Sequence, residues 1–123
     1  MKYILLAYAN REAWDAAETE LRETGKMPDS MQKACDFYEE IGKELAASGE
    51  FVTAEGLGHP AQARTVRNQA GAAVASDGPY AEAKEVLVSF SILDCASYDR
   101  AMEIAARVTE NVGDTVEVRP IGA

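Results

Sequence analysis

The clearest strand in this sequence is the stretch Val86-Leu87-Val88-Ser89-Phe90-Ser91-Ile92-Leu93. Successive side chains of a strand point to opposite faces, so the even-numbered positions, all apolar, share one face. The odd-numbered positions, two of which are serines, share the other face. Downstream, Ser97 is a typical cap for a helix, and residues 114–120 alternate as a closing strand. The C-terminal part of the chain is therefore predicted to be strand, helix, strand.

Upstream of this stretch the sequence predicts a further strand and two helices. Residues 2–9 are apolar with hardly a break, which is typical of a central strand. A short helix capped by Asn10 ends at Gly25. A longer helix opens at Pro28-Asp29-Ser30, carries apolar residues along one face and ends at Gly49.

Between the longer helix and the 86–93 strand, the sequence predicts a strand over 51–57 and a hairpin over 63–76 that turns at Ala70-Gly71. Without the hairpin and the short helix, the order is βαββαβ, the order of a ferredoxin-like α+β fold. Helices then cover one face of an antiparallel sheet, and the odd-numbered face of 86–93 stays bare and half apolar. We therefore predict a homodimer in which a second copy covers that face.

Length and composition limit the classes of protein. The 123 residues fit one domain, predicted over 1–123. Twelve basic against 21 acidic residues give a net charge of −9, which disfavours nucleic acid and anionic membranes as partners. Cys35 and Cys95 are 60 positions apart and form no disulfide or zinc pattern, so we expect reduced thiols and a cytoplasmic location. We expect no metal, and no phosphate-binding cofactor loop is recognisable.

The stretch Asp77-Gly78-Pro79-Tyr80-Ala81-Glu82-Ala83-Lys84-Glu85 holds four ionisable side chains within nine residues. Three neighbouring carboxylates repel one another, so one of them could hold a proton and act as an acid or base. Asp77 is the candidate for this role. The alternative interpretation is a solvated loop in which Asp77 caps its own turn.

Three other side chains are candidates for the same chemistry. His59, the single histidine, lies between two predicted strands and could carry a proton beside Asp77. Arg64 and Arg67 are three positions apart on a strand and so face opposite sides. Either arginine could clamp an anionic ligand, or pair with Asp77 or Glu82.

The nine-residue stretch resembles the Asp-Gly-Pro-Phe motif of the DGPF family, a branch of the YCII-related proteins. Tyr80 stands for the Phe and Ala83 for a Thr of the usual motif. The resemblance extends over nearly the whole chain in the right order. Its other parts are Met1 to Leu6, Thr65 to Arg67, and Val116 to Pro120.

This resemblance implies a ferredoxin-like fold that dimerises into an α+β barrel, and for some members a regulatory link to a sigma factor. YCII relatives carry a His near the start of the main helix, where this chain has Ser30-Met31-Gln32, so their His–Asp pair is not carried over. Asp77 is carried over, with Tyr80 and Glu82 as ligand-binding candidates.

Two functions follow from these residues. The first is a small-molecule-binding or regulatory module without turnover. The alternative is a cofactor-free isomerase, lyase or oxygenase with Asp77 as acid or base, His59 as proton carrier, and Arg64 or Arg67 holding a small, anionic substrate.

Overall fold

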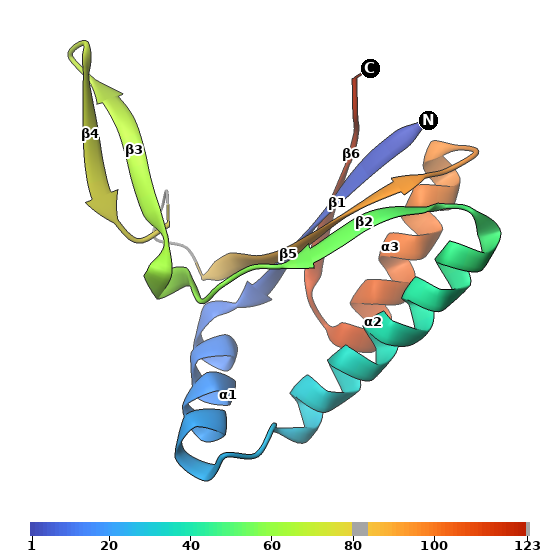
Figure 1. The fold of residues 1–123 in the computed structure, drawn as a ribbon, viewed down its shortest axis with the longest axis horizontal. Helices are drawn as coiled ribbons and strands as arrows, with labels where there is room; N and C mark the ends of the chain where they lie inside the picture. Colours follow the sequence, from blue (N-terminus) through green and yellow to red (C-terminus); the bar gives the residue numbers. More distant parts are fainter. Residues whose placement is uncertain (80–83, 123) are drawn as a thin grey trace.

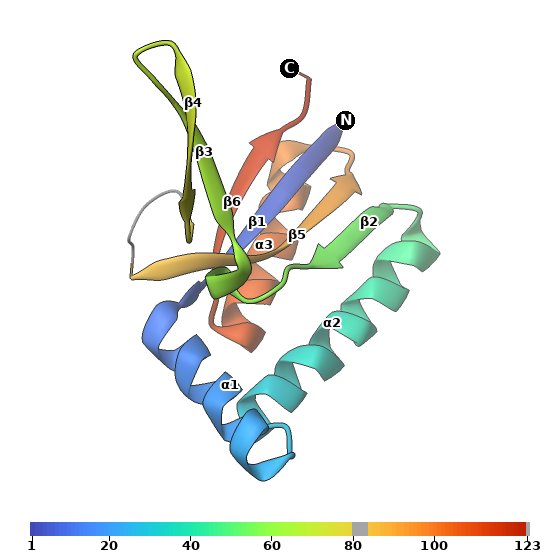
Figure 2. The same ribbon diagram turned by 60° about the vertical axis from the view of Figure 1, so that its left-hand side comes forward.

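The computed structural model describes residues 1–79 and 84–122, coloured along the chain in Figure 1. Four strands form one antiparallel sheet in the order β2-β5-β1-β6, and α2 and α3 lie on one face of it (Figures 1 and 2). This arrangement confirms the predicted α+β, ferredoxin-like order. The elements are β1 (Lys2–Asn10), α1 (Arg11–Thr24), α2 (Asp29–Ser48), β2 (Phe51–Gly56), the 3-10 turn η1 (Pro60–Gln62), β3 (Arg64–Gln69), β4 (Ala72–Asp77), β5 (Glu85–Asp94), α3 (Tyr98–Val112) and β6 (Thr115–Pro120).

The predicted caps set the helix boundaries. The Asn10 side chain accepts a hydrogen bond from the Ala13 amide at 3.0 Å, and Ser97 accepts one from the Arg100 amide at 3.1 Å. Gly25 ends α1 in the left-handed conformation at φ 70°, which a side chain would strain. The hydrogen bonds to Asn10 and Ser97 each satisfy a backbone amide that the start of a helix leaves without a partner.

The main core lies between the sheet and the helices α2 and α3. Leu5 and Leu93 from the sheet pack with Ile41 and Leu45 from the second half of α2 and with Ile104 from α3. Each side chain of this size contributes about 1.5–3 kcal/mol when it is fully buried. A smaller cluster, formed by Ala7, Ala9, Val86 and Val88 with Trp14 against it, joins the start of α1 to the sheet.

β5 departs from the strict alternation predicted for it. Ala7 of β1 pairs with Ser89, but Tyr8 pairs with Leu87, which leaves Val88 as an extra residue in β5. Such a bulge exchanges the faces of the side chains beyond it. Leu93, expected on the bare face together with the two serines, is instead 2% exposed and lies in the core. The face assignment is therefore wrong beyond Val88.

The other side of the sheet, which we call the outer face, carries none of the described helices (Figures 1 and 2). Ile4 pairs with Ile92 across β1 and β5, and alternation places Leu6 beside them. Glu117 and Arg119 of β6 pair with Leu6 and Ile4 and edge this apolar patch. A bare, half-apolar face exists as predicted, but it is built largely from other residues.

Strands β3 and β4 form a separate two-stranded sheet, which we call the arm. The arm turns at Ala70 and Gly71, whose φ angles of 53° and 88° suit a tight hairpin turn, as predicted. It projects away from α2 and α3 (Figures 1 and 2), and all of its strand residues except Thr65 are exposed. None of the described helices is long and apolar enough to span a membrane.

Candidate functional site

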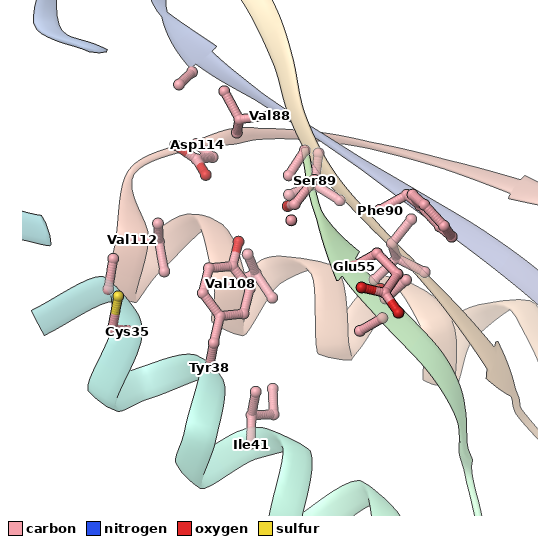
Figure 3. Close-up of a pocket in the computed structure, with 18 of the residues that line it drawn as sticks. Cys35, Tyr38, Ile41, Glu55, Val88, Ser89, Phe90, Val108, Val112 and Asp114 are labelled. Atoms are coloured by element: carbon pink, nitrogen blue, oxygen red, sulfur yellow. The ribbon is translucent and has the colours of Figure 1, made fainter. Parts of the chain in front are cut away.

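A cleft of about 690 Å³ opens between the helices α1 and α2 and the helix-bearing face of the sheet (Figure 3). Its walls are mostly apolar. The cleft exists because the first half of α2 lies apart from the sheet (Figures 1 and 2) and the sheet presents small side chains opposite it. Met31, Ala34 and Tyr38 line the cleft from α2, whereas Ser89 and Ser91 line it from β5. The cleft is therefore the space between an amphipathic helix and a sheet whose side chains are too small to fill it.

Polar groups meet at one end of the cleft. Figure 3 shows the Tyr38 ring rising from α2 toward Ser89 on β5 and toward Asp114, just before β6. Burial raises the pKa of Tyr38 to about 12, and the nearby Asp114 carboxylate adds to the rise, while a hydrogen bond from Ser89 opposes it. Tyr38 thus carries a neutral hydroxyl, which can donate a hydrogen bond to a ligand or accept one from it.

Asp114 is the second polar group at this end. It follows the Gly113 cap of α3 and comes just before β6. Burial raises the pKa of its carboxyl group above the ordinary value. Among the described residues, no side chain forms an ion pair or hydrogen bond with this carboxylate, although its backbone carbonyl accepts a bond from Thr109 at 2.9 Å. A half-buried carboxylate without a partner is an expected feature of a binding site.

Two further side chains in the walls could contact a ligand. Trp14 of α1 lines the cleft, and its indole Nε1 is buried without a hydrogen-bond acceptor among the described residues. The free thiol of Cys35 lies in the α2 wall. Cys95 is also a free thiol, but it is buried in the core, and burial raises its pKa.

His59 lies outside this cleft and fastens α1 to η1. Its Nδ1 accepts a hydrogen bond from the Ala61 amide at 3.0 Å, so the ring proton is on Nε2. That nitrogen is hydrogen-bonded to Asp15 Oδ1 at 3.1 Å and lies 2.8 Å from Glu18 Oε2. Both ring nitrogens are therefore engaged in holding two elements together.

Asp77 lies on the arm, not on the cleft. Its side chain is 89% exposed, and its Oδ1 lies 3.4 Å from Nε of Arg64, so the predicted ion-pair alternative for Arg64 is confirmed. No hydrogen bond or ion pair joins Asp77 to His59 within residues 1–79 and 84–122. Arg67 is exposed on the same strand. Tyr80 and Glu82 lie outside the described residues.

The cleft residues Tyr38, Trp14 and Asp114 were not among the predicted site residues. Helical spacing marks Tyr38 and Trp14 as core positions. Asp114 stands out in the sequence only as the first residue of a predicted strand. One sequence signal was available. The apolar stripe of α2 extends over about four turns from Met31 to Leu45, and it begins well before Ile41 and Leu45, the two positions of α2 that the structure buries.

Comparison with known proteins places the chain in a family. The family model of the YCII-related domain matches residues 1–122. The chain is also similar to an uncharacterised protein of Rhizobium meliloti (strain 1021), with 37% identity over 92 residues, covering 68% of this chain and 74% of that protein. Together with the α+β order of the structure, the match over nearly the full length shows that the chain belongs to the YCII-related domain family.

Proposed function

We propose that this YCII-related protein binds a small, largely apolar molecule in the cleft between α1, α2 and the sheet. The observation that carries the proposal is the cleft itself. Its volume of about 690 Å³ suits a small-molecule ligand, and apolar walls with a few converging polar groups are typical of such sites. Tyr38, Ser89 and Asp114 would orient the ligand, and the apolar walls would supply most of the binding energy.

The binding function is better supported than turnover through Asp77. An acid or base must lie within hydrogen-bond reach of the bound substrate. Asp77 is exposed on the arm beside Arg64, and His59 uses both ring nitrogens for structural contacts. The sigma-factor link and the cytoplasmic location remain predictions.

The test uses the single tryptophan, because Trp14 lines the cleft. We expect 2-phenylethanol to change the Trp14 fluorescence in a saturable way. Ala34→Phe places a ring in the cleft and should weaken binding about tenfold or more, since it removes apolar space that the ligand needs. Ala46→Phe is the matched control, an exposed position of α2 outside the cleft. Equal binding by all three proteins would contradict the site.

We further propose that the protein acts as a homodimer joined through the outer face. Ile4, Leu6 and Ile92 form an apolar patch there that no described helix covers, and a second copy supplies an equal patch. Light scattering coupled to gel filtration should give twice the chain mass of 13.2 kDa. Ile92→Lys should lower the mass toward that of one chain, whereas Met102→Lys on the exposed side of α3 should leave the dimer intact. A dimer that survives Ile92→Lys would assign the interface elsewhere.

A further inference from the structure

We propose that the cleft selects an apolar cation, a protonated amine on a hydrocarbon or aromatic body, and rejects anions. This inference rests on the proposed function, because it names the ligand class of the same cleft. It also replaces the anionic substrate expected from Arg64 and Arg67, which lie on the arm.

The first argument is the charge of the cleft walls. Among the described residues that line the cleft, two are acidic, Glu55 at the edge strand β2 and Asp114, and none is Lys, Arg or His. An anionic ligand would leave water for a space with no cation to pair with it, which costs far more than burial of a neutral group. A carboxylate ligand would also be repelled by Asp114.

The second argument is the unpaired state of Asp114. Half-buried carboxylates in proteins are normally paired, and this one has no ionic or hydrogen-bonding partner among the described residues. Other acidic groups of the chain do have cationic partners, for example Glu50 with Arg100 and Glu44 with Arg107. An ammonium group at the Tyr38 end of the cleft would give the Asp114 carboxylate the cationic partner that no described residue provides.

The third argument is the direction of the helices. Val112 and Gly113, at the C-terminal end of α3, line the cleft, and α3 has no basic residue in its last turn to offset its negative end. The starts of α1 and α2 also border the cleft, but each has an acidic residue in its first turn, Glu12 and Asp29. The helix ends therefore leave a net negative field at the Asp114 end.

The fourth argument is the aromatic content of the walls. Among the described residues, three aromatic side chains on the helix-bearing side border the cleft: Trp14, Tyr38 and Phe51. Their ring faces carry partial negative charge and attract cations, while their surfaces pack well against a hydrocarbon body. The same walls thus favour both parts of an amphiphilic amine.

The experiment compares three probes of similar shape: 2-phenylethylamine, which is a cation at neutral pH, neutral 2-phenylethanol, and anionic 3-phenylpropionate. Trp14 fluorescence reports binding of each. We expect the amine to bind about tenfold or more tightly than the alcohol, as a charge-assisted hydrogen bond allows, and the carboxylate not to bind measurably.

Two variants locate the source of the selectivity. Asp114→Asn should weaken amine binding about tenfold and leave alcohol binding unchanged, since it removes only the charge. Glu110→Gln on the exposed side of α3 changes the net charge equally outside the cleft and should leave both affinities unchanged. Amine affinity should also fall as the pH is lowered and Asp114 becomes protonated, and this pH dependence should be smaller in Asp114→Asn, which leaves Glu55 as the acidic residue of the described cleft lining.

The outcomes separate the two proposals. If the alcohol or the carboxylate binds as tightly as the amine, the cleft is a ligand site and the assignment of a cation is overturned. If Glu110→Gln weakens the amine as much as Asp114→Asn, the preference comes from the net charge of the chain, and the assignment is again overturned. If none of the three probes binds, the proposed function fails and this inference fails with it.

Discussion

The two halves of α2 carry one continuous apolar stripe, yet the stripe is buried only in the second half. Ile41 and Leu45 in the second half are buried against the sheet and α3. Met31, Ala34 and Tyr38 in the first half are less buried and line the cleft, which ends against Ile41 and Leu45. The difference comes from the opposite wall, which offers Leu93 to one half and Ser89 to the other. An amphipathic pattern therefore predicts which face of a helix is apolar, but not what covers it.

The largest expected effect separates the packed end from the open end. Ile104→Ala empties a site that is 1% exposed in the core and should lower the free energy of unfolding by about 2–5 kcal/mol. Met31→Ala removes a side chain that borders a space already open, so its effect should stay below about 1 kcal/mol. Urea denaturation measures both. Similar losses would show that the cleft is closed in solution.

The second expected effect concerns the paired carboxylate at the packed end. The Glu50 side chain is 16% exposed, and its two oxygens accept hydrogen bonds from Nε and Nη2 of Arg100 at 2.9 and 3.0 Å. These bonds hold the pKa of Glu50 below its ordinary value, so its contribution is present above the unfolded-state pKa and is lost as the pH falls through the folded-state pKa. Glu50→Gln should cost about 1–2 kcal/mol at neutral pH and less in acid. A pH-independent loss would assign the effect to packing.

The third effect has the opposite sign, because Asp114 at the open end has no partner. Burial raises its pKa, so stability is greatest below the unfolded-state pKa and falls as the pH rises through the folded-state pKa. Asp114→Asn should therefore raise the neutral-pH stability by less than about 1 kcal/mol, since the group is half exposed and screened. The gain should vanish in acid. Thermal unfolding at several pH values measures it, and a loss at neutral pH would reveal a partner for this carboxylate.

The smallest effect on global stability is expected at His59. No residue of α1 is fully buried, so contacts such as the hydrogen bond between His59 and Asp15 matter for holding this helix. His59→Gln should change the free energy of unfolding by about 1 kcal/mol or less, but speed amide hydrogen exchange in α1 selectively. Equal acceleration in α1 and α3 would mean that His59 stabilises the whole fold.

The sequence sufficed for the element order, because each boundary has a local physical cause. Asn10, Gly25 and Ser97 determine helix ends through single hydrogen bonds or one backbone angle, and those causes are visible residue by residue. The bulge at Val88 was not predictable in the same way, since it depends on how two distant strands pair.

The candidate site was predicted less well than the fold. Asp77 and His59 stand out in sequence because of their residue types, but the structure gives them partners, Arg64 and the pair Asp15 and Glu18. Asp114 is an ordinary residue in sequence and becomes notable only because its surroundings withhold a partner. Isolation of a charge is a property of three-dimensional packing, and no motif encodes it.

The extra residue in β5 also has a consequence for engineering this protein. Residues 85–88 and 89–94 of one strand follow separate alternations, so Val88 and its neighbour Ser89 both line the cleft. A library meant to reshape the ligand site from β5 should randomise positions 88, 89 and 91 together, while a library meant to alter solubility should use 87, 90 and 92. Counting every second residue through the strand would mix the two aims and damage both surfaces.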